Sequence, residues 1–435
     1  MPTELSLVLS PKQAADPVLH TTLVAQRLRI DPVRIALLRI VRRSIDARGR
    51  SVRVNLGFEV YVDGEQRPPE IRFDYPDVNH RTPVVVVGSG PAGLFAALRL
   101  IELGLKPIVL ERGRDVSARK RDIAQINRNG AVDPDSNYAF GEGGAGTYSD
   151  GKLFTRSKKR GDYRRALEVF RFHGADESIL YDAHPHIGTD RLPRIIAAMR
   201  RSIADAGGEV LFGVKVTGVQ IKDDRICGVW LGDTLVEGAA VILAAGHSAR
   251  DIYEILDRDG VRLEAKAFAM GVRAEHPQRL IDSIQYHMPE RGEYLPAAAY
   301  SLVAQVGGRG VYSFCMCPGG FIVPAMTRSG ESVVNGMSPS GRDGNPAGGF
   351  RTPARRTRGV GRVAFPAAAR GAGLCPGRRP AGGTGPAVGR FRARDGVENA
   401  AEVFLCTGCG SDRGAPVAPP VYFRGASRRF CRVRP

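Results

Sequence analysis

The sequence predicts an α/β protein with flanking α+β parts, and three observations support this. Four valines, residues 84–87, form a buried strand that runs into a glycine-rich turn and an apolar helix. Residues 52–62 alternate apolar and polar side chains, as a half-buried strand does. Apolar periodicity disappears beyond residue 350. We therefore expect a small α+β domain (residues 1–78), a Rossmann-like domain (79–260), a partial second α+β domain (261–345) and a tail (346–435).

Composition is that of a globular protein, with 43% hydrophobic and 25% charged residues in a chain of 435. The longest apolar stretch, residues 84–100, is broken by three glycines and Pro91, so we expect no membrane span. The N-terminus lacks a basic start followed by an apolar core, so no secretory signal is expected. We predict a cytoplasmic protein whose seven cysteines are thiols.

The net charge of +18 is concentrated in the tail. Residues 351–435 hold 17 Arg, no Lys and four acids, and Arg, Gly, Ala and Pro together make up more than half of this segment. One interpretation is a disordered arm that binds RNA or another polyanion. The other is a frameshift in a GC-rich gene, because these four residue types have GC-rich codons. Lys occurs nine times before residue 350 and never after it, which favours the frameshift.

The two interpretations of the tail differ in whether a nucleic-acid partner is expected. A nucleic-acid partner is expected only if the basic tail is genuine. Cys406 and Cys409 have metal or redox spacing, but no second pair lies nearby, so their spacing is taken as accidental.

The segment 1–75 has a predicted β-α-β-β order. Strands are expected at 4–9, 33–41 and 52–62, and a helix at 19–28. Residues 42–49 are interpreted as a basic connection between the last two strands. Its segment RRSIDAR (42–48) is more simply a solvated hairpin end than an anion contact.

The strongest motif is the sequence PVVVVGSGPAG at residues 83–93, which places G-x-G-x-x-G between a strand and a helix. Gly88 permits the turn, Gly90 lets a pyrophosphate approach the backbone, and Gly93 lets helix and strand pack closely. The helix N-terminus offers peptide N–H groups to phosphates. Glu111 ends the strand that follows this helix, where an acid can accept hydrogen bonds from ribose hydroxyls. The pattern predicts dinucleotide binding.

The chain beyond Glu111 continues the α/β pattern after a long excursion. A helix is predicted whose apolar positions share one face: Leu192, Ile195, Ile196, Met199 and Ile203. Short apolar segments between residues 209 and 238 predict a three-stranded meander with a turn at Asp223 and Asp224. The segment AAVILAAG then returns as a buried strand. Ser248 and Asp251 are expected to form a capping box for the following helix.

This order of elements resembles the two-dinucleotide-binding flavoprotein fold, in which FAD lies extended across the sheet. Further motifs, RRSIDAR, GEGGAGTYSDGKL (141–153), AHPHIGTDRL, VYSFCMCPGGFIVPA and VVNGMS, together resemble a bacterial family of FAD-dependent dehydrogenases, also called NAD(P)/FAD-dependent oxidoreductases. The resemblance covers about residues 1–345. It implies FAD, a small N-terminal domain and an interleaved second domain, but no agreed substrate.

The resemblance also implies which residues contact the cofactor. The loop GEGGAGTYSDGKL holds five glycines within eleven positions, and we expect it to line the pyrophosphate and flavin, with a surface Ω-loop as the alternative. The expected cofactor-binding residues are Gly88, Gly90, Pro91, Ala92, Gly93, Glu111, Arg112, Gly143, Gly144, Gly146, Ser149, Asp150, Lys152, Val216, Ala245, Gly246 and His247.

Candidates for chemistry are Cys315, Cys317 and His186. A cysteine near a flavin can act as a thiolate or an acid, while the simpler alternative is a small apolar filler. His186 can donate a proton or serve only as a loop residue. No metal site is predicted, and no second G-x-G-x-x-G stands between a predicted strand and helix, so no dedicated NAD(P)H domain is indicated. NAD(P)H, if it is the electron donor, would bind the second domain or react at the flavin face.

These residues predict an FAD-dependent oxidoreductase that transfers a hydride through flavin N5 on an unidentified small-molecule substrate. One alternative is a non-catalytic FAD- or NAD-binding protein with a basic interaction surface. The other is a thiazole-synthase-like enzyme in which Cys315 or Cys317 donates sulfur. Under the frameshift interpretation the chain lacks the segment that returns to the flavin ring, so it would bind FAD poorly or be inactive.

Overall fold

The computed structural model describes residues 2–155, 161–264, 271–306, 309–313, 316–331 and 333–342. At its centre is a parallel sheet in the order β10–β4–β5–β6, which confirms the predicted α/β class and the Rossmann-like arrangement. The strands of this sheet are β4 (Pro83–Val87), β5 (Lys106–Glu111), β6 (Glu209–Phe212) and β10 (Val241–Leu243). The segment AAVILAAG returns beside β4, as predicted.

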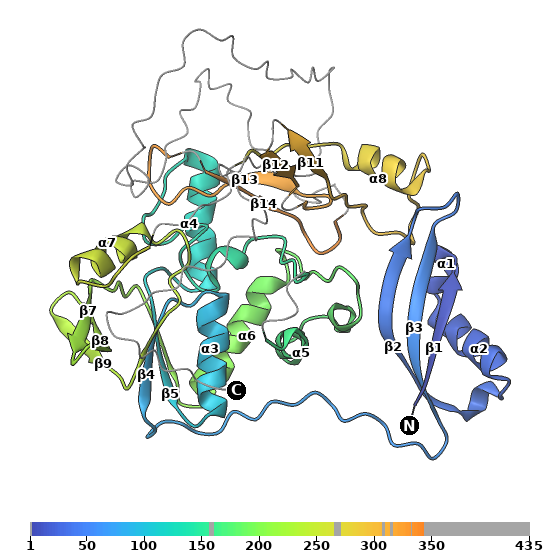
Figure 1. Ribbon diagram of the computed structural model, residues 1–435, viewed down its shortest axis with the longest axis horizontal. Helices are drawn as coiled ribbons and strands as arrows, with labels where there is room; N and C mark the ends of the chain where they lie inside the picture. The colour runs from blue at the N-terminus through green and yellow to red at the C-terminus, as the bar shows by residue number, and fades with distance from the viewer. Residues whose placement is uncertain are drawn as a thin grey trace, which may run out of the picture.

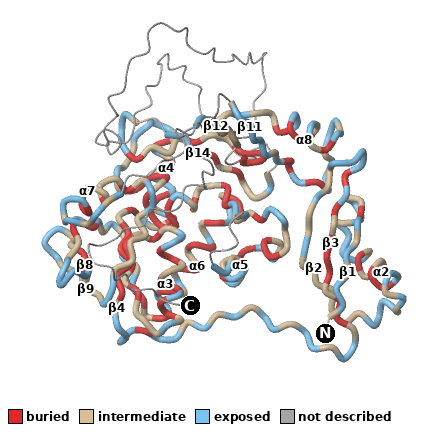
Figure 2. The backbone as a smooth tube through the Cα atoms, in the orientation of Figure 1, coloured by how far each residue is buried: buried red, intermediate tan, exposed pale blue. Residues whose placement is uncertain are grey.

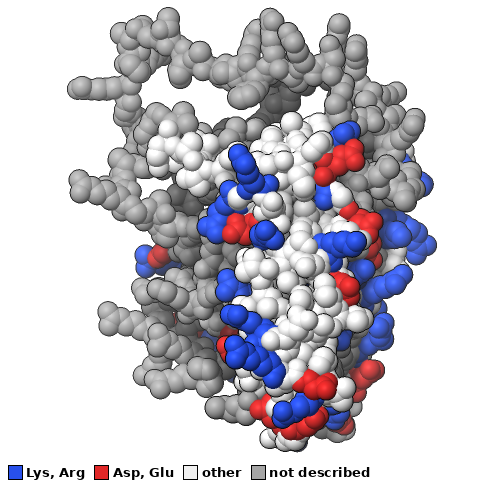
Figure 3. All heavy atoms as spheres, turned by 90° about the vertical axis from the view of Figure 1, so that its right-hand side faces the viewer, with Lys and Arg blue, Asp and Glu red and all other residues white. Residues whose placement is uncertain are grey.

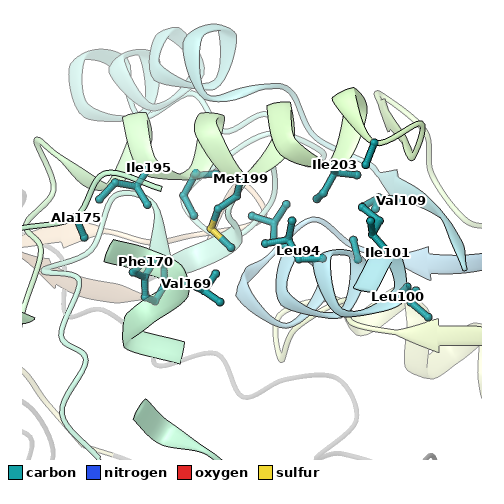
Figure 4. Packing of buried hydrophobic residues seen from close by; sticks show 14 of the residues in the cluster. Leu94, Leu100, Ile101, Val109, Val169, Phe170, Ala175, Ile195, Met199 and Ile203 are labelled. Atoms are coloured by element: carbon teal, nitrogen blue, oxygen red, sulfur yellow. The ribbon is translucent and has the colours of Figure 1, made fainter. Parts of the chain in front are cut away.

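Helices α3 (Pro91–Glu102) and α6 (Leu192–Asp205) cover one face of the sheet. All five apolar positions predicted for α6 are buried. Met199 and Ile203 point toward α3 in Figure 4, where Leu94 belongs to the same core. This packing holds the N-terminus of α3 at a set position above the carboxyl end of β4.

The other face of the sheet is covered by a three-stranded antiparallel meander and by α7 (Arg250–Arg258). The meander consists of β7 (Gly218–Lys222), β8 (Arg225–Leu231) and β9 (Thr234–Glu237). Both Asp223 and Asp224 have positive φ, the geometry of a tight hairpin turn, so the predicted turn is confirmed. The apolar segment before β7 instead joins the parallel sheet as β6.

The predicted capping box before α7 is wrong. The helix begins at Arg250 with Ala249 at its N-cap, and no side chain caps it. Asp251 lies one residue inside the helix, and its carboxylate pairs with Arg112 and Lys215. The Asp251 side chain, which the local spacing assigned to the helix cap, therefore forms ion pairs with Arg112 and Lys215 instead.

The N-terminal unit (residues 2–62) is a separate antiparallel sheet in the order β1–β3–β2. It comprises β1 (Thr3–Leu9), α1 (Pro11–Ala14), α2 (Pro17–Leu28), η1 (Pro32–Arg34), β2 (Ile35–Asp46) and β3 (Arg53–Val62). The predicted basic connection is partly wrong, because β2 continues to Asp46, which pairs with Arg53. Most of RRSIDAR is therefore strand. Basic and acidic side chains are interspersed on the outer face of this unit (Figure 3).

A long connection between β3 and β4 runs along the edge of the molecule and is mostly exposed or half-buried, whereas buried residues concentrate in β4, α3 and α6 (Figures 1 and 2). Between β5 and α6 lie α4 (Val116–Asn129), η2 (Gly144–Gly146), α5 (Tyr163–Phe172) and η3 (Glu177–Leu180). Within the described ranges, no helix combines the length and apolar character needed to span a membrane.

The hairpin unit (described residues between 271 and 342) lies over α4 (Figure 1). It consists of α8 (Gln278–Tyr286), β11 (Val303–Val306), β12 (Arg309–Tyr312), β13 (Phe321–Pro324) and β14 (Val334–Met337). Val323 packs against Ile123 and Ile126 of α4. The predicted tail, residues 346–435, lies outside the described residues.

The α3–α6 core predicts a specific loss of stability. Ile203 is fully buried, so Ile203→Ala should lower the free energy of unfolding of the central sheet by about 2–5 kcal/mol. The single tryptophan, Trp230 on β8, gives a fluorescence signal for urea unfolding. Arg201→Ala, at an exposed position on the same helix, should leave the transition nearly unchanged.

Candidate functional site

The glycine-rich turn after β4 has two glycines that the fold itself requires. Gly88 has φ +103°, and a Cβ there would lie 2.6 Å from the carbonyl oxygen of Ala244. A Cβ on Gly93 would lie 1.9 Å from the Gly88 oxygen. Both therefore allow backbone segments to approach closely, as predicted from their spacing.

Gly90 differs because nothing in the described part of the chain requires it to be glycine. Its φ is −66°, which any residue can adopt, and a Cβ there would meet only Gly144 Cα, at the ordinary distance of 3.8 Å. The neighbouring Pro91 and Ala92 are exposed at the first turn of α3. Open space over a bare backbone beside a helix N-terminus fits the pyrophosphate of a dinucleotide.

Glu111 lies at the end of β5 as predicted, but its carboxylate is already hydrogen-bonded. It accepts the Ser89 N–H at 2.9 Å and the Ser89 hydroxyl at 2.8 Å. The N–H groups of Gly113 and Gly141 donate to its other oxygen at 2.9 and 3.0 Å. A carboxylate has about four acceptor positions, so a ribose hydroxyl would have to replace one of these donors.

The glycine loop predicted to line the cofactor lies directly against this turn. The Gly143 N–H donates to the backbone carbonyl oxygen of Ser89 at 2.9 Å. A Cβ on Gly144 would approach Gly90 Cα to 3.0 Å, and one on Gly113 would lie 2.6 Å from Gly141 Cα. The turn and the loop thus form one continuous backbone surface at the N-terminus of α3.

Arg119 on α4 holds the glycine loop, and sequence reasoning missed it. Its fully buried guanidinium donates to the backbone oxygens of Asn137, Tyr138, Glu142 and Gly144 at 2.7–3.0 Å. Burial lowers the pKa of Arg119 to about 10, against the opposing effect of nearby Tyr148, Glu111 and Glu142. No element was predicted from the sequence for this stretch, and its neighbours Lys120 and Arg121 give no local sign that Arg119 is buried.

A second cluster forms where the glycine loop meets the hairpin unit. Lys152 Nζ lies 2.8 Å from Cys317 Sγ and 3.1 Å from the Asp150 carboxylate. Arg342 also pairs with Asp150, at 3.1 Å, and the Ser338 hydroxyl donates to the same carboxylate. An ammonium beside a buried thiol is an arrangement that stabilises a thiolate. The fold therefore brings together Lys152 and Cys317, which are far apart in the sequence.

His186 lies at the edge of this cluster. Its segment forms an isolated β-bridge with Lys152, and its Nε2 is 3.2 Å from the Ser340 carbonyl oxygen. Burial lowers the pKa of His186, and the positive charge of Arg342 lowers it further, against the opposing effect of Asp150. His186 is therefore mainly neutral at pH 7 and can accept a proton. Cys315, the other predicted cysteine, lies outside the described residues.

The remaining predicted cofactor residues lie around the sheet edge. Arg112 pairs with Asp135 at 2.5 Å and Asp251 at 2.9 Å, and its guanidinium lies over the Phe140 ring. Val216 is buried in the apolar cluster beneath the meander. These two side chains have structural partners in the protein itself.

The other predicted positions adjoin the glycine turn or the loop. Ala245 is close to the turn, since a Cβ on Gly88 would lie 3.3 Å from its Cα, and Gly246 and His247 are exposed beside it. The Ser149 hydroxyl donates to the Gly146 oxygen within the loop. In the described part of the chain, no group of three or more His, Cys, Asp or Glu side chains could hold a metal ion.

Family models match three parts of the chain. One described as an FAD binding domain matches residues 81–129, which include the glycine turn and Glu111. The chain carries an FAD-binding domain. A model described as FAD-dependent protein, C-terminal domain-like, matches residues 267–349, and a domain of unknown function matches residues 1–61.

Relatives with similar sequences are matched over part of their own length. An uncharacterized protein of Clostridium beijerinckii is 40% identical over 340 residues, which are 74% of this chain and 63% of that protein. The thiamine thiazole synthase of Archaeoglobus fulgidus is 27% identical over 183 residues, 39% of this chain and 57% of that enzyme. The chain thus spans less than two thirds of either relative.

Solved structures show weaker likenesses. The THI4 structure from Thermovibrio ammonificans has a TM-score of 0.28 and 20% identity, covering 42% of this chain and 64% of that one. The L-amino acid deaminase of Proteus vulgaris, with its specific insertion sequence deleted, has a TM-score of 0.28 and 14% identity, covering 50% of this chain and 66% of that one.

The Arg119 contacts predict that the glycine loop depends on one side chain. Arg119→Gln should leave buried carbonyls without donors and raise chymotrypsin cleavage after Tyr138 and Phe140 by at least about tenfold, since a hydrogen bond to a charged group contributes about 1.5–3 kcal/mol. Lys120→Gln, at an exposed position on the same helix, is the matched control. Equal cleavage in the two variants would contradict this role.

The charge beside His186 predicts a pKa change that NMR can follow. In the unaltered protein the imidazole should titrate below its ordinary pKa, because burial and Arg342 disfavour its charged form. Arg342→Gln removes a positive charge and should raise the pKa of His186. Histidine C2–H chemical shifts followed against pH measure both values, and an unchanged or lower pKa in the variant would contradict the assignment.

Proposed function

We propose that this protein is an FAD-dependent oxidoreductase that oxidises a small molecule by hydride transfer to flavin. The observation that carries the proposal is Gly90, a glycine with open space above it that neither its φ nor its packing requires. The match of residues 81–129 to an FAD binding domain supports the same cofactor. When bound, FAD supplies two-electron redox chemistry, accepting a hydride from the substrate.

Different residues of the chain would bind the cofactor and transfer protons. The glycine turn and the first turn of α3 would bind the pyrophosphate, and the loop held by Arg119 would exclude water along it. Cys317 would hold or release a proton at Sγ, with Lys152 Nζ 2.8 Å away. His186, mainly neutral at pH 7, would accept a proton from the substrate. NAD(P)H in the role of electron donor would replace the oxidised small molecule as the source of the hydride, and it would bind the hairpin unit or react at the flavin face.

A thiazole-synthase-like activity is the second candidate. The similarity to the thiazole synthase of Archaeoglobus fulgidus supports it, together with the buried position of Cys317 beside Lys152. Sulfur donation would leave Cys317 as dehydroalanine, lighter by the mass of H₂S. Intact-mass and peptide analysis of purified protein separates this candidate from hydride transfer, which leaves the cysteine unchanged.

Turnover separates an oxidoreductase from a protein that binds FAD without catalysis. Stoichiometric flavin in the purified chain that is bleached by a reductant and reoxidised by an added acceptor supports the oxidoreductase. Bound flavin that a reductant cannot bleach supports a structural cofactor. The same preparation shows whether a chain that ends in residues 343–435 binds FAD, because its flavin content is measured directly.

The open space at Gly90 predicts a variant that loses the cofactor but keeps the fold. In Gly90→Ala the added methyl meets the protein only at 3.8 Å, so the cofactor-free Tm should hold or rise slightly. Overpacking against the pyrophosphate should weaken FAD binding by about 10- to 100-fold, corresponding to roughly 1–3 kcal/mol.

Gly49→Ala is the matched control for this variant, since its new methyl would meet only the Ser51 oxygen at 4.0 Å, far from the turn in sequence. Flavin fluorescence titration measures both affinities. If Gly90→Ala binds FAD as tightly as Gly49→Ala, the pyrophosphate does not lie over Gly90, and the proposal loses its main support.

A further inference from the structure

A large cavity lies between the N-terminal unit and the rest of the protein. Its volume is about 1150 Å³. The main stretches of chain that line it are the end of β2, residues 175–195, residues 284–299 and residues 340–342. Figure 1 shows β2 facing the central unit, with α8 above them. The glycine turn is not part of its lining.

The cavity walls are joined by specific contacts. The backbone N–H of Arg43 donates to the carbonyl oxygen of Tyr181 at 2.8 Å. The backbone N–H of Ala183 donates to the carbonyl oxygen of Arg43 at 2.9 Å. The Arg43 guanidinium makes a two-pronged pair with Asp182 at 2.5 and 2.7 Å. Val52 belongs to an apolar cluster that includes Tyr286. The N-terminal unit therefore contacts both the central unit and the hairpin unit.

The lining has an excess of positive charge, with five arginines against three aspartates. Arg43 and Arg48 pair with Asp182 and Asp46. Within the residues that the structure describes, Arg42 and Arg191 make no close ion pair, and Arg191 interacts at longer range with the carboxylates of Asp176 and Asp190. An arginine without a hydrogen-bonded carboxylate at a concave surface can attract anions, and its planar fork suits carboxylate and phosphate oxygens.

Arg342 provides an independent observation that favours an anion site. Its side chain is 11% exposed, and its Nε is buried without a hydrogen-bond partner in the described part of the chain. Its Nη2 atom pairs with Asp150 at 3.1 Å. A buried donor without a partner costs free energy, which an acceptor on a ligand would recover.

The cavity also has an apolar part. Ile45, Ile187, Ile195, Ile284 and Tyr286 contribute to its lining. Pockets for small molecules are commonly about 300–1000 Å³ and combine apolar walls with a few convergent polar groups. The volume lies slightly above this range, and the mixed lining fits an organic molecule with a charged head and an apolar body.

Two lining residues connect the cavity to the Lys152–Cys317 cluster. Arg342 pairs with the Asp150 carboxylate that Lys152 also contacts. His186 lines the cavity and forms a β-bridge with Lys152. A ligand in the cavity would therefore lie next to the groups assigned to proton handling.

We propose that this cavity is the substrate site of the protein and that it takes a small organic anion, a carboxylate or phosphate ester on an apolar body. Arg42, Arg191 and Arg342 would bind the charged head, and the isoleucines would contact the body. That the bound anion is a substrate rests on the proposed function. The binding of the anion itself does not depend on FAD.

Calorimetry with simple probes tests the proposal on the full chain, with and without added FAD. Octanoate and octyl phosphate carry the two possible heads, octanol is the neutral match, and inorganic phosphate is the head alone. We expect octanoate or octyl phosphate to bind at least tenfold more tightly than octanol, with an affinity that falls as salt rises. Arg191→Gln should weaken binding about tenfold, the effect of losing one charge-assisted hydrogen bond.

Arg201→Gln, an exposed arginine on α6 outside the cavity, should change binding by less than twofold. Arg42→Gln, at an exposed strand position, is a second test that should also weaken binding. The proposal would be overturned if octanol bound as tightly as octanoate and octyl phosphate, or if inorganic phosphate were the only probe that bound. It would also be overturned if neither octanoate nor octyl phosphate bound, or if Arg191→Gln and Arg42→Gln both left their affinity unchanged. Absence of flavin with intact anion binding would count against the proposed function only.

Discussion

The guanidinium of Arg119 is the interaction on which the candidate cofactor site depends. A segment as rich in glycine as residues 141–151 has few side chains to bury and loses much backbone entropy on ordering. Arg119 compensates with hydrogen bonds to four backbone oxygens in residues 137–144. Glu111 completes the arrangement from the other side, since its carboxylate joins the glycine turn to Gly141. A hydrogen-bonded backbone surface with few side chains results at the N-terminus of α3.

The same loop connects the three units of the protein. Its first half lies on the glycine turn of the central unit, and its second half contacts the hairpin unit through Asp150 and Lys152. Residues 151 and 152 also pair with the segment around His186, which lines the cavity shared with the N-terminal unit. One short stretch of chain therefore contacts the cofactor surface, the candidate proton-handling groups and the candidate substrate cavity.

Two wrong predictions have the same cause. Ser248 and Asp251 have the spacing of a capping box, yet Asp251 pairs with Arg112 and Lys215 from the sheet side. The segment RRSIDAR has the composition of a solvated loop, yet it continues β2, and Arg43 pairs with Asp182 of the central unit. In both cases partners distant in sequence outweighed a local preference, because ion pairs and strand pairing depend on which segments meet in space.

By itself the sequence determined the elements whose signals are local: the valine strand, the G-x-G-x-x-G turn, the apolar face of α6 and the hairpin turn at Asp223 and Asp224. Their periodicity and backbone requirements are properties of neighbouring residues. Only the tertiary structure decided that Arg119 is buried, that Lys152 lies beside Cys317, and that three arginines from distant segments line one cavity. Burial and charge pairing are set by residues far apart in the chain, and one sequence carries no local record of them.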